Sequence, residues 1–350
     1  MIGRRALLGG AATLAAPLVA ARGTRAQYFP QGFREDQIRF PGTSSGGGDV
    51  TLAATITVPM ISEIQRVPGV VLVAGSGPTD RDGNNPLIPV RVDLLKQIAA
   101  TLANAGIASL RYDKRGIAGS AVSPQRTFDR ALDPRERFFT WDQFVGDVQA
   151  AHAELLRHGE IKPYATALLG HSEGGLLAIA ASVAMGRKRP YGLVIASTPG
   201  RPLGDIVRQQ IARTAPGLSA SAERIMTTIR ETGQVPTNGP PAFRSIFPDY
   251  AGAFLQAAFA FDPAQALAQT DIPCLLLQGA ADTQVVAMGD IQPLIDTLGK
   301  RTAPGEALIA PQVSHNLKLL AGPDDPGFAG PLAPSIALKL TGWLRHLLGA

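Results

Sequence analysis

Several features that would assign a chain to a particular class are scarce or missing in these 350 residues. A single cysteine, Cys274, cannot form an internal disulfide, and no spacing of cysteine and histidine residues resembles a zinc site. Cys274 lies inside an apolar run, which predicts a buried strand residue rather than a reactive thiol. We therefore expect neither a disulfide framework nor a metal or other cofactor.

A run long enough to span a membrane is also missing from the N-terminus. The uncharged, mostly apolar stretch at residues 6–21 is shorter than the ~20 residues that a span needs. It follows Arg4 and Arg5 and precedes Thr24-Arg25-Ala26, and this order is typical of an export signal. We predict that residues 1–26 direct export by the twin-arginine route, with an ordinary Sec signal or an N-terminal anchor as the alternative. The mature chain would be periplasmic or secreted, without stable insertion into a membrane.

Acidic residues are absent from the same segment, and this accounts for the basic balance of the whole chain. Residues 1–26 hold four of the 33 basic residues and none of the 28 acidic ones, so the rest is nearly neutral. A neutral body gives no reason to expect nucleic acid or an anionic membrane as a partner. With 45% hydrophobic and 17% charged residues, that body is expected to be globular.

Short apolar runs and helical patterns alternate along most of the chain. Residues 37–40 and 50–58 alternate in polarity around a glycine-rich connection, which is typical of a hairpin. Wholly apolar runs then predict strands buried on both faces, and segments with apolar residues three and four apart predict helices between them. This order predicts an α/β fold with a mostly parallel sheet, helices on both faces and an N-terminal antiparallel hairpin. The expected buried strands are 70–74, 107–112, 165–169, 193–197, 274–278 and 307–310, and the expected helices are 92–105, 141–158, 173–185, 290–298 and 335–348.

One interval, residues 200–262, breaks the alternation because helical segments follow one another there without a strand. We predict that it is a helical cap inserted into a core made of residues 27–199 and 263–350. The interval contains five of the 13 phenylalanines, which are expected to form the cap's own core. The alternative is that some of them line an apolar acyl pocket. These residues are Phe243, Phe247, Phe254, Phe259 and Phe261.

Two pentapeptides match Gly-x-Ser-x-Gly, and at most one of them is expected to be chemical. Ser44 lies in the glycine-rich connection of the predicted hairpin, with no helix after it. Ser172 lies between a predicted strand and a predicted helix, where a sharp turn lifts a serine hydroxyl clear of the sheet. The helix N-terminus also presents free N–H groups to an oxyanion formed there. Ser172 is therefore the candidate nucleophile.

A serine nucleophile needs a base, which is itself oriented by an acid. Of the five histidines, His315 alone occupies a loop just after a late apolar strand, so it is the candidate base. Asp282 follows the strand that contains Cys274, at the sheet edge where open α/β sheets place their sites, and is the candidate acid. Asp290, eight residues on, is the fallback. The remaining histidines are assigned to helices or to the turn beside the serine: His152, His158, His346 and His171.

The oxyanion hole and the substrate contacts are predicted from two segments. If Gly75 occupies the turn after an early strand, the Ser76 N–H is the expected partner of the Glu173 N–H. Gly75, Gly77 and His171 are expected to line the substrate site. Neither phosphate-loop pattern follows these glycines, so a phosphate-binding loop is not expected. Two charged segments, Asp80-Arg81-Asp82 and Arg111 to Gly116, are expected to be scaffolding, with Asp113 and Arg115 holding the loop under the site.

Together these residues resemble a known family, the α/β-hydrolase-fold esterases of the serine-aminopeptidase-like and dienelactone-hydrolase-related branch. The shared segments span residues 52–315 and include VLVAGSGPTDRDGN, RYDKRGIAGS, LLGHSEGGLLA, QGAADTQV and VSHNLK. The resemblance implies Ser172 as nucleophile, His315 as base, Asp282 as acid and a helical cap. The chain departs from the family at Ala118, where the pattern Gly-x-Gly-x-Ser has its second glycine, and across the cap.

The expected function is that of a serine carboxylesterase that cleaves small esters with short or medium acyl groups and needs no cofactor. The chain order Ser172, Asp282, His315 is the one associated with α/β-hydrolases. One alternative is an aminopeptidase or amidase with the same triad, which would need an acidic anchor for a free amine. A second alternative is a ligand-binding protein on the same fold that hydrolyses nothing. The cap acids considered as an anchor are Asp205, Glu223, Glu231 and Asp249.

Overall fold

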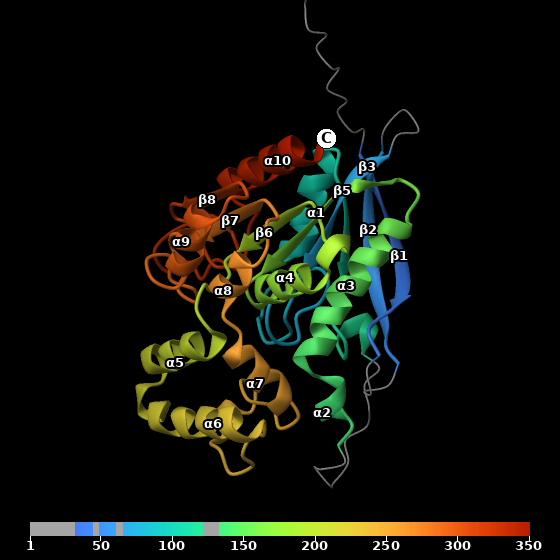
Figure 1. Ribbon diagram of the computed structural model, residues 1–350. Coiled ribbons are helices and arrows are strands. Elements are labelled where there is room, and N and C mark those ends of the chain that lie inside the picture. Colours follow the sequence, from blue (N-terminus) through green and yellow to red (C-terminus); the bar gives the residue numbers. More distant parts are fainter. Residues whose placement is uncertain (1–31, 45–48, 61–65, 122–132) are drawn as a thin grey trace, which may run out of the picture.

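An eight-stranded sheet forms the centre of the computed structural model, which describes residues 32–44, 49–60, 66–121 and 133–350 (Figure 1). The strand order is β1-β2-β4-β3-β5-β6-β7-β8. β1 pairs antiparallel with β2, β2 pairs antiparallel with β4, and the remaining pairs are parallel. The predicted mostly parallel sheet with an N-terminal hairpin is confirmed. The strands are β1 Phe33–Pro41, β2 Thr51–Pro59, β3 Val67–Val73, β4 Ala108–Tyr112, β5 Ile161–His171, β6 Gly192–Ala196, β7 Cys274–Gly279 and β8 Gly305–Ala310.

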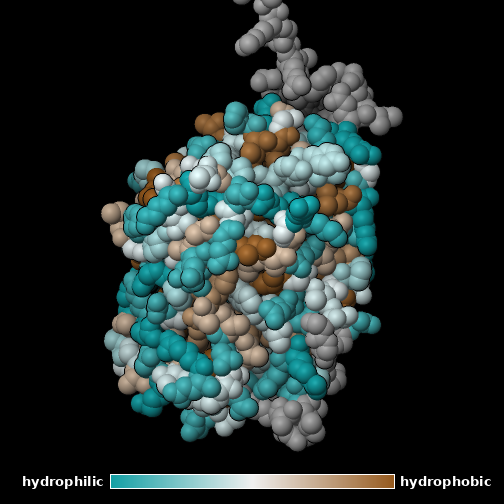
Figure 2. Space-filling view, viewed as in Figure 1, coloured by the Kyte–Doolittle hydropathy of each residue, from teal (hydrophilic) through white to brown (hydrophobic). Residues whose placement is uncertain are grey.

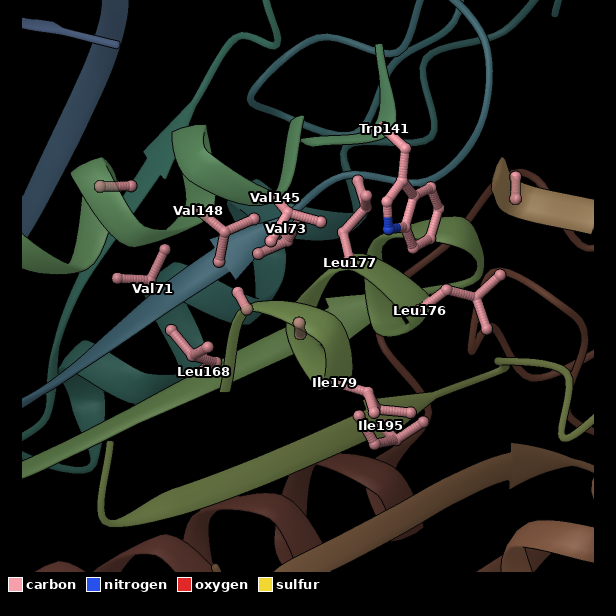
Figure 3. Packing of buried hydrophobic residues seen from close by; sticks show 14 of the residues in the cluster. Val71, Val73, Trp141, Val145, Val148, Leu168, Leu176, Leu177, Ile179 and Ile195 are labelled. Carbon is pink, nitrogen blue, oxygen red and sulfur yellow. The ribbon is translucent and has the colours of Figure 1, made fainter. Parts of the chain in front are cut away.

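Helices cover both faces of this sheet, as the continuous apolar strands require. Successive residues of a strand point to opposite faces, so β3 buries Val71 and Val73 on one side and Val70 and Leu72 on the other. The first face packs against α3 and α4, whose apolar side chains meet those of β3, β5 and β6 (Figure 3). The second face packs against α1 and α10. These helices are α1 Leu94–Asn104, α3 Trp141–Arg157, α4 Glu173–Ala184 and α10 Pro334–Leu348.

Helices alone fill the described chain between β6 and β7; those at residues 203–260 lie beyond one end of the sheet, whereas the last one packs beside α4 (Figure 1). Four of the five phenylalanines in this segment are buried. The rings of Phe254 and Phe261 lie 5.8 and 5.1 Å from the Trp141 ring at the start of α3, so aromatic contacts join the segment to the core. The longer helices are α5 Leu203–Thr214, α6 Ser219–Thr232, α7 Gly252–Ala260 and α8 Pro263–Ala268.

The surface seen in Figure 2 carries mostly hydrophilic residues, with hydrophobic ones in small separate groups. Within the described ranges, no helix is both long enough and apolar enough to cross a membrane. The predicted export signal, residues 1–26, lies outside the described residues, so its assignment stays a prediction. Cys274 is fully buried in β7, as predicted, and burial raises the pKa of its thiol to about 12.

Candidate active site

Ser172 occupies the turn between β5 and α4, in a backbone conformation that few residues other than glycine adopt. Its φ is 55° and its ψ is −123°. The flanking glycines permit this turn, because a Cβ on Gly170 would lie 2.2 Å from the Gly174 carbonyl oxygen. A Cβ on Gly174 would lie 2.3 Å from the Val73 carbonyl oxygen. The pattern therefore matters for packing: it lets the strand, the turn and the helix come this close.

His315 and Asp282 meet at the same edge of the sheet, from the loops after β8 and β7. The distance between His315 Nδ1 and Asp282 Oδ2 is 2.8 Å. Gln278 Nε2 donates to the same oxygen at 2.9 Å, and the Gln284 and Val285 N–H groups donate to Oδ1 at 2.8 and 2.9 Å. Burial opposes ionisation of Asp282, but His315 and the two backbone hydrogen bonds outweigh it and lower the pKa of the carboxyl. An ionised carboxylate only accepts, so Nδ1 carries the proton and Nε2 is left as the basic nitrogen.

The side chain of His171, the residue before Ser172, is buried and contacts the His315 loop. Its Nε2 lies 2.8 Å from the His315 carbonyl oxygen, and the two ring centroids are 4.9 Å apart. Burial, with a smaller contribution from His315, lowers the pKa of His171 to about 3. The ring is therefore neutral at ordinary pH and donates its Nε2–H to that carbonyl. His315 lies beside the Ser172 turn, while the hydrogen bond between these two side chains stays a prediction.

The loop after β3 reaches the same place, and Gly75 lies against the serine. A Cβ on Gly75 would lie 3.4 Å from Ser172 Cβ. Ser76 and Gly77 are exposed, and Gly77 adopts a left-handed φ of 69°. Neither the Ser76 N–H nor the Glu173 N–H has an acceptor among the described residues. Two backbone donors are thus available near Ser172, although their role as an oxyanion hole stays a prediction.

Sequence reasoning did not identify the individual contacts of several residues that support these groups. Gln278 binds Asp282, and Thr198 Oγ1 lies 3.0 Å from the Ser172 carbonyl oxygen, to which it can donate. The buried Lys114 contacts the loop after β3. Gln278 did leave a signal, because it is a polar residue inside an otherwise apolar strand, and a buried polar group needs a partner. The sequence signal for Lys114 was weaker: it is a charged residue just after a buried strand.

The structure gives partners to the two residues that were expected to hold this loop, Asp113 and Arg115. Asp113 accepts from the Arg81 N–H at 2.7 Å and from Arg81 Nη2 at 2.8 Å, so it joins its loop to the loop after β3. Arg115 instead pairs with Asp147 of α3 at 2.7 Å, with both side chains buried. The two residues hold different neighbours because each reaches across to another element rather than along its own loop.

Comparison with known proteins places this arrangement in context. Residues 91–318 match the family model described as "Serine aminopeptidase, S33". Esterase EstD from Thermotoga maritima is 28% identical over 262 residues, which cover 73% of this chain and 54% of that protein. This chain therefore spans about half the length of the curated relative that it matches.

Two solved structures show the fold. Est1E from Butyrivibrio proteoclasticus, with ferulic acid bound, superposes with a TM-score of 0.56 at 14% identity, over 86% of this chain and 97% of that one. The alpha/beta hydrolase GrgF from Penicillium sp. sh18 superposes with a TM-score of 0.55 at 18% identity, over 91% of this chain and 100% of that one. The sheet order and these likenesses identify the α/β-hydrolase fold that the sequence predicts.

Proposed function

Because the chain belongs to the serine aminopeptidase S33 family, we propose that it is a serine hydrolase, and specifically a carboxylesterase for small esters. The observation that carries this proposal is the hydrogen bond between His315 Nδ1 and Asp282 beside the strained Ser172 turn. The relative EstD is named an esterase, which supports ester cleavage by this chain as well. No metal or cofactor enters the proposed reaction.

The proposed mechanism is a two-step acyl transfer. Ser172 Oγ attacks the ester carbonyl while His315 Nε2 takes its proton, and ionised Asp282 stabilises the resulting imidazolium. The N–H groups of Ser76 and Glu173 hold the negative oxygen of the tetrahedral intermediate. His315 then protonates the leaving alcohol, and the same steps with water release the acid from Ser172.

Esters are favoured over aminoacyl amides because Glu173 and three of the four cap acids considered as an amine anchor are paired with cations. A peptidase that recognises a free amine needs a carboxylate to bind it. Glu173 Oε1 lies 3.4 Å from Lys114 Nζ. In the helical segment, Asp205 and Glu223 each lie 2.7 Å from Arg208, and Asp249 lies 3.5 Å from Arg135. These pairs lower the attraction of those carboxylates for an ammonium group.

We also propose that residues 200–262 are a cap that shapes the acyl side of the substrate site. The segment begins just after Thr198, which contacts the Ser172 carbonyl. In α5, Gln210 Nε2 donates to the Gln284 carbonyl at 3.0 Å, two residues after Asp282. Because many side chains of the segment are apolar, we expect it to favour uncharged acyl groups, of short or medium length, over charged acyl groups.

Export is proposed on the sequence alone. Arg4 and Arg5 before an apolar stretch support a signal at residues 1–26 and a periplasmic or secreted mature protein. Mass spectrometry of protein recovered from the host's exported fraction should find a mature N-terminus near Gln27.

Hydrolysis of p-nitrophenyl acetate and butyrate, compared with aminoacyl p-nitroanilides, tests the function. The wild type should prefer the esters, and Ser172→Ala should lower kcat by about 10⁴-fold or more. Ser44→Ala, in the second pentapeptide, is the matched control and should keep the wild-type rate. A fluorophosphonate probe should label Ser172 and no other residue.

Each contrary result has its own meaning. Full activity of Ser172→Ala would exclude the proposed nucleophile. Faster cleavage of the anilides would favour the aminopeptidase alternative, and a folded protein that neither turns over nor takes the label would favour the ligand-binding one.

A further inference from the structure

A buried lysine contacts both segments that present free backbone donors beside Ser172. Lys114, in the loop after β4, is 3% exposed. Its Nζ donates to the Gly75 carbonyl at 2.5 Å and lies 3.4 Å from Glu173 Oε1. The Lys114 ammonium also lies over the Phe144 ring, with Nζ 6.0 Å from the ring centroid. A buried ammonium is costly unless it is paired and hydrogen-bonded, so these contacts fix where it lies.

The bond to Gly75 fixes the direction of the next N–H group. Among the described residues every peptide bond is trans, and in a trans peptide the C=O and the following N–H point in opposite directions. Lys114 holds the Gly75 carbonyl on one side of this peptide, so the Ser76 N–H must point to the other side. The ammonium also polarises the peptide, which makes the Ser76 N–H a stronger donor.

The contact with Glu173 links the second donor to the first. Glu173 begins α4, so its N–H belongs to the helix N-terminus directly after Ser172. The carboxylate of the same residue faces Lys114 Nζ, with its side chain 9% exposed. One ammonium therefore connects the loop after β3 to the start of α4.

We propose that Lys114 is a positioning residue that holds the Ser76 and Glu173 N–H groups in register as one oxyanion hole. The proposal rests on the proposed esterase function and assigns a role to a side chain that does not touch the substrate. Donors aimed at the oxyanion stabilise the transition state more than the bound ester. Loss of Lys114 should therefore lower kcat and leave KM nearly unchanged.

Lys114→Met tests this role because it removes the ammonium and keeps a side chain of similar length. We expect kcat for p-nitrophenyl acetate to fall by about 30-fold to 300-fold, with KM within about threefold of wild type. A trifluoromethyl ketone inhibitor, which forms a negatively charged adduct on serine, should lose affinity by a similar factor. Lys114→Arg keeps the positive charge and the donors and should recover part of the rate.

Lys318→Met is the matched control for the removal of a buried lysine. Lys318 is 0% exposed, and its Nζ donates to the Gly330 carbonyl at 2.9 Å and to Gln97 Oε1 at 2.5 Å, whereas Lys114 Nζ contacts Gly75 and Glu173. Both variants should lower the thermal unfolding midpoint, whereas only Lys114→Met should show the matched loss of kcat and inhibitor affinity. If Lys114→Met does not fold, Glu173→Gln replaces it and should lower kcat by about threefold to tenfold with KM unchanged.

The outcomes separate this role from the function on which it rests. An active wild type whose Lys114→Met variant keeps kcat and inhibitor affinity within about threefold overturns the role of Lys114 alone. A loss of the same size in Lys318→Met also overturns it, because the effect would then follow stability. A wild type that cleaves no ester overturns the proposed function, and the role of Lys114 with it.

Discussion

Two segments of this chain carry the same pentapeptide pattern, residues 42–46 and 170–174, and their serines lie in different structural settings. Ser44 is exposed in the connection between antiparallel strands β1 and β2. Ser172 lies between a parallel strand and a helix, and its own φ is 55°. The pattern is compatible with both positions, and the next element of the chain decides between them: a strand in one case, a helix in the other.

The residue before each serine shows the same contrast. The Thr43 N–H donates to Asp147 Oδ1 at 2.9 Å, and its carbonyl accepts from Arg115 Nη2 at 2.9 Å. These bonds anchor the hairpin on α3 through a buried ion pair. His171 instead holds the carbonyl of His315. One segment is therefore a structural anchor and the other lies at the candidate catalytic site, a difference that only long-range contacts reveal.

The largest predicted effect comes from removing the group that orients His315, which should make Ser172 as inert as Ser44. Asp282→Asn should lower kcat by about 10⁴-fold, because an amide at this position can stabilise the wrong tautomer and cannot stabilise the imidazolium. Steady-state kinetics on p-nitrophenyl butyrate measures this, with circular dichroism as the check on folding.

Asp290→Asn is the matched control, since Asp290 was the fallback acid. Its carboxylate accepts from the Val286 N–H at 2.7 Å and pairs with Arg201, whereas His315 pairs with Asp282. We expect kcat within about tenfold of wild type and a loss of stability instead. Similar losses of kcat in the two variants would contradict the role of Asp282 as the acid that orients His315.

A smaller effect should separate the first glycines of the two segments. In Gly170→Ala the new Cβ would meet backbone atoms of Gly174 at 2.2 to 2.4 Å, whereas in Gly42→Ala it would meet side chains, with Val50 Cγ1 nearest at 2.6 Å. Side chains can move aside more easily than a helix backbone. We expect Gly170→Ala to lower the free energy of unfolding by about 3 kcal/mol and Gly42→Ala by about 1 kcal/mol. Urea unfolding measures both, and equal costs would contradict the close approach at Ser172.

Much of the core could be predicted from sequence because its strands are buried on both faces. β6 and β7 were predicted to within one residue at each end, since continuous apolar runs mark such strands. β1 was predicted as residues 37–40 but spans Phe33–Pro41. Most of its residues are exposed and polar, so its length is set by pairing with β2 and not by its own pattern. The short helix α8 was missed for a similar reason, because six residues carry too little periodicity.

At the site, Asp282 and His315 could be predicted as the candidate acid and base from their residue types and their positions along the chain. Each follows a strand of a parallel sheet at the same edge. The supporting contacts could not be found in this way. Arg115 was expected to hold its loop together with Asp113, but the sequence did not indicate its partner, Asp147, 32 residues away. His171 was expected to line the substrate site, which stays a prediction, and the bond of its ring to a carbonyl 144 residues on was not foreseen. Contacts between side chains of different elements follow no fixed spacing in the sequence, so the sequence does not predict them.

The smallest predicted effect concerns pH and again separates His171 from its counterpart Thr43. The pKa of His171 falls from an ordinary 6.5 to about 3 in the folded chain. Between these values the unfolded chain binds a proton that the folded chain does not, so stability falls as the pH drops below 6.5. At pH 5.5 the loss should be at most about 1.4 kcal/mol from this residue. Buried His152, with a pKa lowered to about 4, adds a similar loss.

His171→Gln isolates the contribution of His171, because the glutamine amide can place a donor near the position of His171 Nε2, which bonds the His315 carbonyl, and does not titrate. Its free energy of unfolding should fall about half as much as that of the wild type between pH 7.5 and 5.5. Thr43→Ser should follow the wild-type curve, since neither residue at position 43 titrates. A wild-type slope in His171→Gln would mean that His171 is solvated or charged in the folded protein, and the contrast between the two segments would then rest on the serines alone.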